Sequence, residues 1–299
     1  MAVDDSGNGV RVSRMLRMRL CSAEATRLAA FYETALGFAR VSVEHFSGAR
    51  SQELFAVGGR VLRITLDLGA QRLVILQFVD QRGRIYPAGT NASDLIFQHF
   101  AIVVADMDMA MAQLGQVRGW SPITTGGPQQ LPASSGGVTA FKFRDPDGHP
   151  LELLAFPSTR VPRHWRRQES AGPFLGIDHS AITVSNTERS VVFYESLGFK
   201  VSNRSVNDDP AQARLDHLHQ PRVDVTALSI DDAPPHLELL CYRNNFNGGP
   251  LRLPANDVAA TCLVLERHMG MAQHQGRQAP IRNLVDPDGH HLSIVSVVA

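Results

Sequence analysis

A single carboxylate interrupts an otherwise apolar strand in the middle of this chain. Residues 141–157 read FKFRDPDGHPLELLAFP, a pattern that predicts two strands joined by a tight turn. In that turn Pro146 presets one backbone dihedral, and Gly148 accepts the positive φ that other residues avoid. Glu152 lies among leucines in the second strand. Burying a carboxylate is costly unless it is paired with a cation or binds a metal, so Glu152 is the first candidate for chemistry.

The same hairpin returns near the C-terminus without its acid. Residues 281–297 read IRNLVDPDGHHLSIVSV, with Ser293 at the place of Glu152. A second motif is also repeated, since residues 31–38 read FYETALGF and residues 193–199 read FYESLGF. Two different motifs that recur at corresponding places indicate an internal duplication.

The periodicity around these motifs predicts four units, each with the order β-α-β-β-β. In unit one a strand at 15–20 precedes a helix at 22–36, which Ser22 caps and Gly37 ends. Ser185 and Glu188 have the spacing of a capping box at the start of the helix of unit three. The predicted division is a disordered tail at 1–13, units one and two at 14–157, a solvated basic linker at 158–174, and units three and four at 175–299, with the helix of unit four shortened to 266–273.

The composition argues against nucleic acids and membranes as binding partners. Lysine and arginine together equal aspartate and glutamate in number, so no overall field attracts nucleic acid or an anionic membrane. The polar first residues lack the apolar stretch of a secretory signal, and no apolar run approaches the ~18 residues of a membrane span. The three cysteines are expected to be buried free thiols. We therefore expect a cytoplasmic protein with a small-molecule substrate, either a monomer or a simple homodimer.

The FY…LGF helix followed by the DPDGH hairpin resembles the vicinal oxygen chelate superfamily, which includes glyoxalases, bleomycin resistance proteins and extradiol dioxygenases. The resemblance covers nearly the whole chain after residue 13. It implies an α+β fold in which four modules pair into two cupped mixed β-barrels. It also implies a metal ion held by one residue from the first strand and one from the last strand of each unit.

Those places in this sequence define one complete site and one degenerate site. Unit two supplies His99 and Glu152, and unit three supplies His179 and Glu238. In fused glyoxalases the units pair across the two halves, so by resemblance unit two is expected to pair with unit three, and unit one with unit four. The first pairing brings all four potential ligands together. The second pairing brings together residues that are not expected to bind a metal, namely Arg17, Val74, Ala260 and Ser293.

Two imidazoles and two carboxylates suit a partly open octahedral site for Ni²⁺, Co²⁺, Zn²⁺, Mn²⁺ or Fe²⁺. The resemblance to glyoxalases makes Glu152 the general base for a proton beside a carbonyl, with Glu238 as the second candidate. It thus predicts a metal-dependent lyase or isomerase for a substrate with neighbouring oxygens. Glutathione is disfavoured, because Thr183 stands where bacterial glyoxalases have an arginine.

Two alternatives remain open from the sequence. One is an extradiol dioxygenase with Fe²⁺ held by two histidines and one glutamate. The other is a metal-free protein that binds a small apolar molecule. Three further histidines that flank turns are expected at the surface: His149, His290 and His291.

Overall fold

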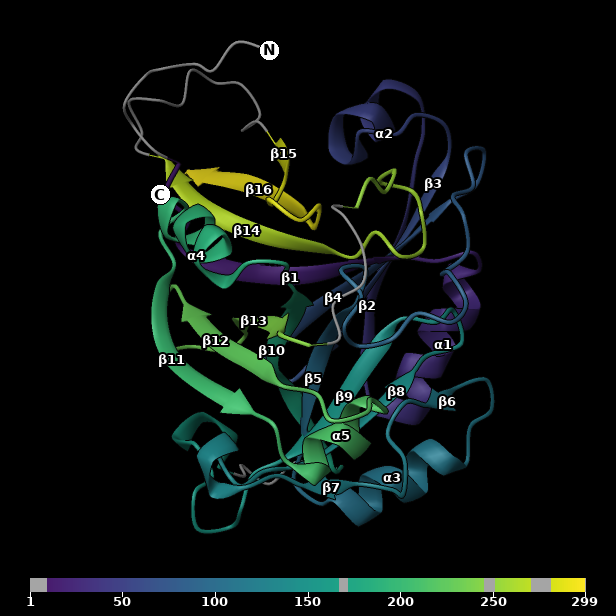
Figure 1. Ribbon diagram of the computed structural model, residues 1–299. Helices are drawn as coiled ribbons and strands as arrows, with labels where there is room; N and C mark the ends of the chain where they lie inside the picture. The colour runs from purple at the N-terminus through teal and green to yellow at the C-terminus, as the bar shows by residue number, and fades with distance from the viewer. Residues whose placement is uncertain (1–9, 167–171, 245–250, 270–280, 299) are drawn as a thin grey trace.

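The computed structural model describes residues 10–166, 172–244, 251–269 and 281–298. These residues form two mixed β-sheets with helices packed against them, which confirms the predicted α+β class (Figure 1). Unit one contains β1 (Arg14–Cys21), α1 (Ala25–Leu36), β2 (Ala39–Phe46), α2 (Gly48–Phe55), β3 (Val61–Leu68) and β4 (Gln71–Phe78). Unit two contains β5 (Gln98–Val104), α3 (Met107–Gly115), β6 (Ser121–Pro122), β7 (Gln129–Gln130), β8 (Thr139–Arg144) and β9 (Pro150–Ala155).

The second half repeats this order in a shortened form. Unit three contains β10 (Phe174–Thr183), α4 (Thr187–Ser196), β11 (Lys200–Asn207), α5 (Pro210–Asp216), β12 (Val223–Ser229) and β13 (His236–Tyr242). Unit four contains β14 (Cys262–Met269), β15 (Ile281–Val285) and β16 (His291–Val298). No helix among the described residues is both long enough and apolar enough to cross a membrane.

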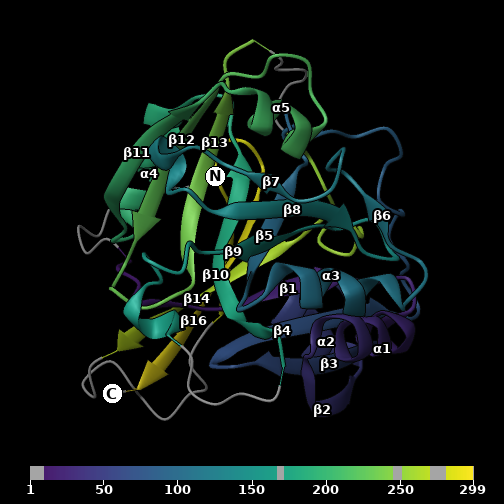
Figure 2. The ribbon, with the colours of Figure 1, turned by 90° about the horizontal axis from the view of Figure 1, so that it is seen from below.

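Each sheet combines one unit from either half of the chain. The seven-stranded sheet has the order β15-β16-β14-β1-β4-β3-β2, and β1 pairs with β14 in antiparallel fashion. Figure 1 shows this directly, because purple β1 lies beside yellow-green β14. The nine-stranded sheet has the order β11-β12-β13-β10-β5-β9-β8-β6, with β7 on β8, and β10 pairs antiparallel with β5 (Figure 2). The predicted pairing of unit two with unit three, and of unit one with unit four, is therefore confirmed.

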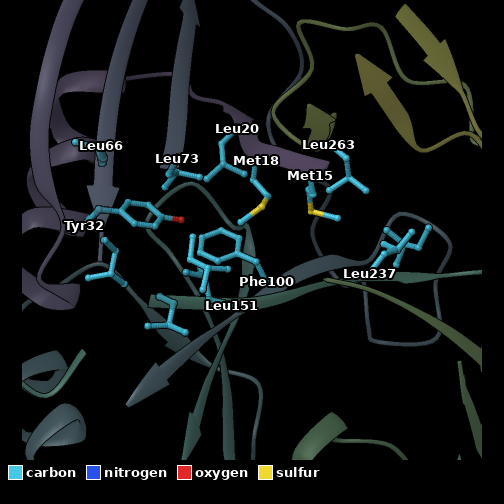
Figure 3. Close-up of a cluster of buried hydrophobic side chains, with 14 of the residues drawn as sticks. Met15, Met18, Leu20, Tyr32, Leu66, Leu73, Phe100, Leu151, Leu237 and Leu263 are labelled. Carbon is cyan, nitrogen blue, oxygen red and sulfur yellow. The ribbon is translucent and has the colours of Figure 1, made fainter. Parts of the chain in front are cut away.

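The main core lies on one face of both sheets. Met18 and Leu20 of β1 meet Phe100 of β5, Leu151 of β9 and Leu263 of β14 in one buried cluster (Figure 3). Side chains alternate along a strand, so the residues between these apolar positions point to the opposite face of each sheet. We call that opposite face the inner face. It is the inner face of the nine-stranded sheet that carries His99 and Glu152.

Several predicted element ends were wrong. The first helix begins at Ala25, and Ser22 instead donates its hydroxyl to Asp147. Ser185 does not cap α4 either: its hydroxyl donates to Asp288, while Asn186 accepts from the backbone of Arg189. In both places the serine hydroxyl forms a hydrogen bond with a carboxylate in the hairpin turn of another unit, so it does not cap its own helix.

The shortened helix predicted at 266–273 is wrong in its first part, because β14 continues to Met269; residues 270–273 lie outside the described residues. Of the predicted tail, residues 1–9 lie outside the described residues. Val12 is buried, and its N–H donates to the Leu197 carbonyl. Trp165 in the linker is also buried, so the linker is not wholly solvated.

The histidines that follow the two DPDG turns are structural, not surface residues. His149 is fully buried between the Asp145 carboxylate and the Val258 carbonyl. His290 is likewise buried and contacts the Thr183 carbonyl. His291 is partly buried against the Leu253 carbonyl. The prediction of surface positions failed because each turn is covered by another unit, a contact that local sequence does not encode.

Candidate metal centre

Three of the four predicted ligands converge on the inner face of the nine-stranded sheet. They come from three strands: His99 from β5, Glu152 from β9 and His179 from β10. Each offers a ligand atom within 4.8 Å of the others, and all three residues are buried. His99 Nε2 lies 2.9 Å from Glu152 Oε2, and the two imidazole rings are 5.8 Å apart between centroids.

Glu238 of β13 lies at the edge of this group. Its Oε2 is 3.7 Å from His179 Nε2, and its Oε1 is 3.4 Å from His236 Nε2. His236 and Glu238 are two residues apart on one strand, so they share a face. Asp178 contacts His179 Nδ1 at 3.1 Å and lies 3.8 Å from His236 Nδ1. Asp178, His179 and His236 form a second set of donors next to the first.

A β-bulge makes this second set possible. The register of β10 against β5 shifts between Ile177 and His179, so Asp178 and His179 both line the same cavity. A bulge changes the direction of a side chain that regular alternation would send to the other face. Trp165 of the linker then holds Asp178 through an Nε1–H hydrogen bond of 2.8 Å.

The donor set fits a divalent metal ion. Nδ1 of buried His99 has no hydrogen-bond partner among the described residues, which is unusual for a buried polar atom, and its Nε2 contacts the Glu152 carboxylate at 2.9 Å. Imidazole nitrogens and carboxylate oxygens at this spacing are the ligands that Zn²⁺, Ni²⁺, Co²⁺ and Fe²⁺ accept. Asp178 beside His179 Nδ1 matches the usual arrangement in which a carboxylate orients a ligating histidine.

A buried cation adjoins the same group. Lys142 of β8 faces Glu152 across the β8–β9 pair, with Nζ 3.9 Å from Glu152 Oε2. Its Nζ also lies 2.7 Å from Asp216 Oδ1 at the end of α5. Asp216 accepts two more hydrogen bonds, from Tyr242 Oη and Gln212 Nε2. Asp216 therefore neutralises Lys142, which leaves Glu152 available to another cation.

The charges in the site are strongly coupled. Burial and the positive charge of Lys142 lower the pKa of His99. Burial opposes ionisation of Glu152, yet Lys142 and His99 hold its pKa below the usual range. For His179 burial acts against protonation, but Glu238 and Asp178 raise its pKa to about 9. His179 and His236 overcome burial and hold the pKa of Glu238 well below its usual range.

A cavity of about 540 Å³ opens onto these residues. Seven strands border it, namely β5 and β8–β13, so the nine-stranded sheet curves around it. No strand pairing among the described residues closes either sheet into a ring, so the predicted cupped barrels are two curved or open mixed sheets. The wall of the cavity also includes polar side chains, such as Ser202, Asn203 and Gln212, and several apolar ones: Leu131, Val138, Leu154, Phe156, Val225 and Leu240.

The seven-stranded sheet corrects one predicted position. Arg17 pairs with Val264 and Arg19 with Cys262, as His179 pairs with Ala101 and Ala181 with His99. Cys262 therefore occupies the place of His99, not the predicted Ala260, which precedes the strand. Deletion in unit four shifted the alignment by two residues. The other predicted members of the degenerate site keep their places, since Arg19 pairs with Val74 and Val264 with Ser293.

Comparisons with known proteins agree with this architecture. Residues 176–294 match the family model described as the Glyoxalase/Bleomycin resistance protein/Dioxygenase superfamily. The match lies in the second half of the chain, which is therefore similar in sequence to that superfamily. No curated protein matches the chain significantly.

Solved structures resemble both halves of the chain in fold. Glyoxalase I from Zea mays is 18% identical with a TM-score of 0.58, over 95% of this chain and 92% of that one. A putative dioxygenase from Bacillus subtilis subsp. subtilis str. 168 is 11% identical with a TM-score of 0.57, over 96% and 86% of the two chains. At these identities the likeness shows the fold and not the activity.

Four neighbours of the predicted ligands were missed from sequence. His236 could have been found from its i, i+2 spacing to Glu238, and Lys142 from its position between two core phenylalanines. Asp216 depends on α5, which was not predicted although Asp209 and Pro210 have the form of a helix start. Asp178 had no sequence signal, because only the bulge turns it towards the cavity.

Proposed function

We propose that this protein is a metal-dependent lyase or isomerase of the glyoxalase type. It would remove a proton beside a carbonyl group of a small substrate that has neighbouring oxygens. The observation that supports this most directly is the convergence of His99, Glu152 and His179 on one cavity, with His99 Nδ1 lacking a hydrogen-bond partner among the described residues. Glu238 would be the fourth ligand.

A bound divalent ion would supply Lewis acidity that stabilises the oxyanion formed when the proton leaves. Side chains of the protein would remove the proton and position the ligands. Glu152 is the proposed base, since its carboxylate is buried at the cavity wall 3.9 Å from Lys142 Nζ. Asp178 would keep His179 in one orientation.

Glutathione is not the proposed substrate. Thr183, at the place of the arginine in bacterial glyoxalases, is buried and donates its hydroxyl to the Ala92 carbonyl. A cavity of about 540 Å³ with a mixed polar and apolar wall favours a compact substrate.

A metal-binding experiment combined with proton exchange tests the proposal. The purified protein is dialysed against each of Ni²⁺, Co²⁺, Zn²⁺, Mn²⁺ and Fe²⁺, and bound metal is measured by mass spectrometry. Exchange of the carbon-bound proton of small α-hydroxyketones with deuterated solvent is then followed by NMR. We expect one metal per chain, loss of metal in H99Q and H179Q, and a fall in exchange of about 10²–10⁴-fold in E152Q. E188Q is the matched control, because Glu188 is an exposed glutamate in a surface ion pair.

Retention of full metal content and exchange by both H99Q and H179Q would show that the assignment is wrong. A protein that binds no metal, yet binds small apolar molecules, would instead be a metal-free binding protein.

One specific observation favours a second candidate, the extradiol dioxygenase. The three closest donors are two histidines and one glutamate, which is the composition of a facial triad for Fe²⁺. Oxygen uptake that requires both Fe²⁺ and a catechol would establish this reaction in place of proton transfer. Units two and three supply these donors, whereas extradiol dioxygenases use units three and four, so we rank this candidate second.

A further inference from the structure

The inner face of the seven-stranded sheet carries two arginines where the other sheet carries its candidate ligands. Arg17 and Arg19 are two residues apart on β1 and alternate with the core residues Met18 and Leu20. Alternation along the strand places both arginines on the inner face. Arg17 follows a bulge between Met15 and Arg17, just as His179 follows one in β10.

These two side chains are deficient in negative partners. Arg19 is only 8% exposed, and Arg17 is partly buried. Within the described ranges neither guanidinium pairs with a carboxylate or donates a hydrogen bond to one. The nearby Arg63 of β3, in contrast, is paired with Glu44. Burial and the charges of Arg63 and Arg19 lower the pKa of Arg17 to about 10.

Placing two guanidinium groups together in a partly dry environment is unfavourable unless an anion compensates them. The residues at the equivalent ligand places, Val74, Cys262 and Ser293, supply no negative charge; burial raises the pKa of the Cys262 thiol. Planar guanidinium groups bind phosphate and carboxylate oxygens in a bidentate manner.

We propose that Arg17 and Arg19 form a binding site for a small oxyanion, a phosphate or carboxylate group, on the inner face of the seven-stranded sheet. The duplicated scaffold would then hold a cation in one sheet and an anion in the other. This anion site does not depend on the proposed enzymatic function, because it shares no residue with the candidate metal centre.

The approach to Arg17 is also positively charged. Arg17, but not Arg19, lines a cavity of about 1080 Å³ together with several other cationic side chains and one acid, Asp231. Two of those cations are neutralised, Arg14 by Glu266 and Arg72 by Asp67. The others extend from the linker: Arg163, His164 and Arg166. A surface of this kind attracts anions over roughly a Debye length, about 8–10 Å at ordinary salt.

Calorimetric titration of the full chain tests the proposal. Inorganic phosphate and succinate are titrated separately at pH 7.5 and constant ionic strength, which distinguishes a phosphoryl site from a carboxylate site. We expect saturable binding of one anion per chain, weakened roughly 10- to 100-fold in R17Q and in R19Q. R40Q is the matched control, because Arg40 is exposed and already paired with Glu33.

A second measurement covers the case in which R19Q fails to fold. R19K keeps the charge but loses the bidentate fork, so we expect it to fold and to bind the anion more weakly than the natural protein. Phosphate or succinate should also raise the Tm of the natural protein by mass action, and raise that of R17Q much less. The proposal is overturned if neither anion binds saturably, or if R17Q and R19K bind as tightly as the natural protein.

Discussion

Removal of the Lys142 ammonium group should destabilise the protein more than any surface ion-pair substitution. Lys142 and Asp216 are 2.7 Å apart, with side chains only 3% and 0% exposed. Breaking a buried pair by removing one partner typically costs about 3–5 kcal/mol, because the other charge stays buried and uncompensated. In K142M the hydrogen bonds from Tyr242 and Gln212 to Asp216 remain, so we expect the lower end of this range, about 3 kcal/mol. At roughly 2–4 °C per kcal/mol, Tm would fall by about 6–12 °C.

A double-mutant cycle measures whether the pair itself is responsible. Urea unfolding at pH 7 would be compared for K142M, D216N and the double variant K142M/D216N. Asn at 216 can still accept from Tyr242 and Gln212, so the double variant should lose less stability than the sum of the single variants, by at least about 1 kcal/mol. Arg204 and Glu188 form an exposed pair for comparison, and R204Q should cost about 0–1 kcal/mol. If K142M cost no more than R204Q, or if the two single effects simply added, the buried-pair reasoning would be refuted.

Three smaller predictions concern the hairpin turn, a close backbone contact and a thiol. Burial opposes protonation of His149, but Asp145 raises the pKa of this histidine in the folded state. The protonated His149 therefore stabilises the fold fully below the unfolded-state pKa of ~6.5, and this stabilisation is lost as pH rises through the folded-state pKa. The stability difference between the natural protein and H149Q, measured by urea unfolding, should accordingly be largest below ~6.5; a difference independent of pH would contradict this sign. G83A should lower the free energy of unfolding by about 1–3 kcal/mol in the same assay, because the added Cβ would lie 2.0 Å from the Asn256 carbonyl oxygen. G115A is the control, because a Cβ at Gly115 would meet no atom within 4 Å. Burial raises the pKa of Cys21 to about 12, so this thiol should react with a disulfide reagent only after unfolding, and rapid labelling of native protein would show that its burial is incorrect.

The local pattern of the sequence was sufficient to predict the units and most of their strands. Alternating apolar residues marked strands such as β8 and β9, and Gly37 ends α1 with a positive φ as expected. These features depend on neighbouring residues along the chain. Short inserted helices were the main local omission, and α5 matters most because it supplies Asp216.

Pairing of the units was predicted from family resemblance, and the structure confirms it through the β5–β10 and β1–β14 ladders. Metal binding by His99, Glu152, His179 and Glu238 stays a prediction, although the structure brings the first three within 4.8 Å of one another. The hairpin carboxylate Glu152 was recognisable at once, because an acid in an apolar strand is costly to bury without a partner.

Sequence by itself thus determined the repeated units, their hairpin turns and the acid that one hairpin keeps and the other lacks. Tertiary structure alone decided which charges surround that acid. Asp178 reaches the cavity because of a bulge in β10. Lys142 is neutralised by Asp216, which belongs to another unit. The register of β1 against β14 places Cys262 at the position that corresponds to His99. The physical reason is that turns and strand periodicity are set by adjacent residues, whereas bulges, register and buried charge pairs depend on segments that are far apart in the chain.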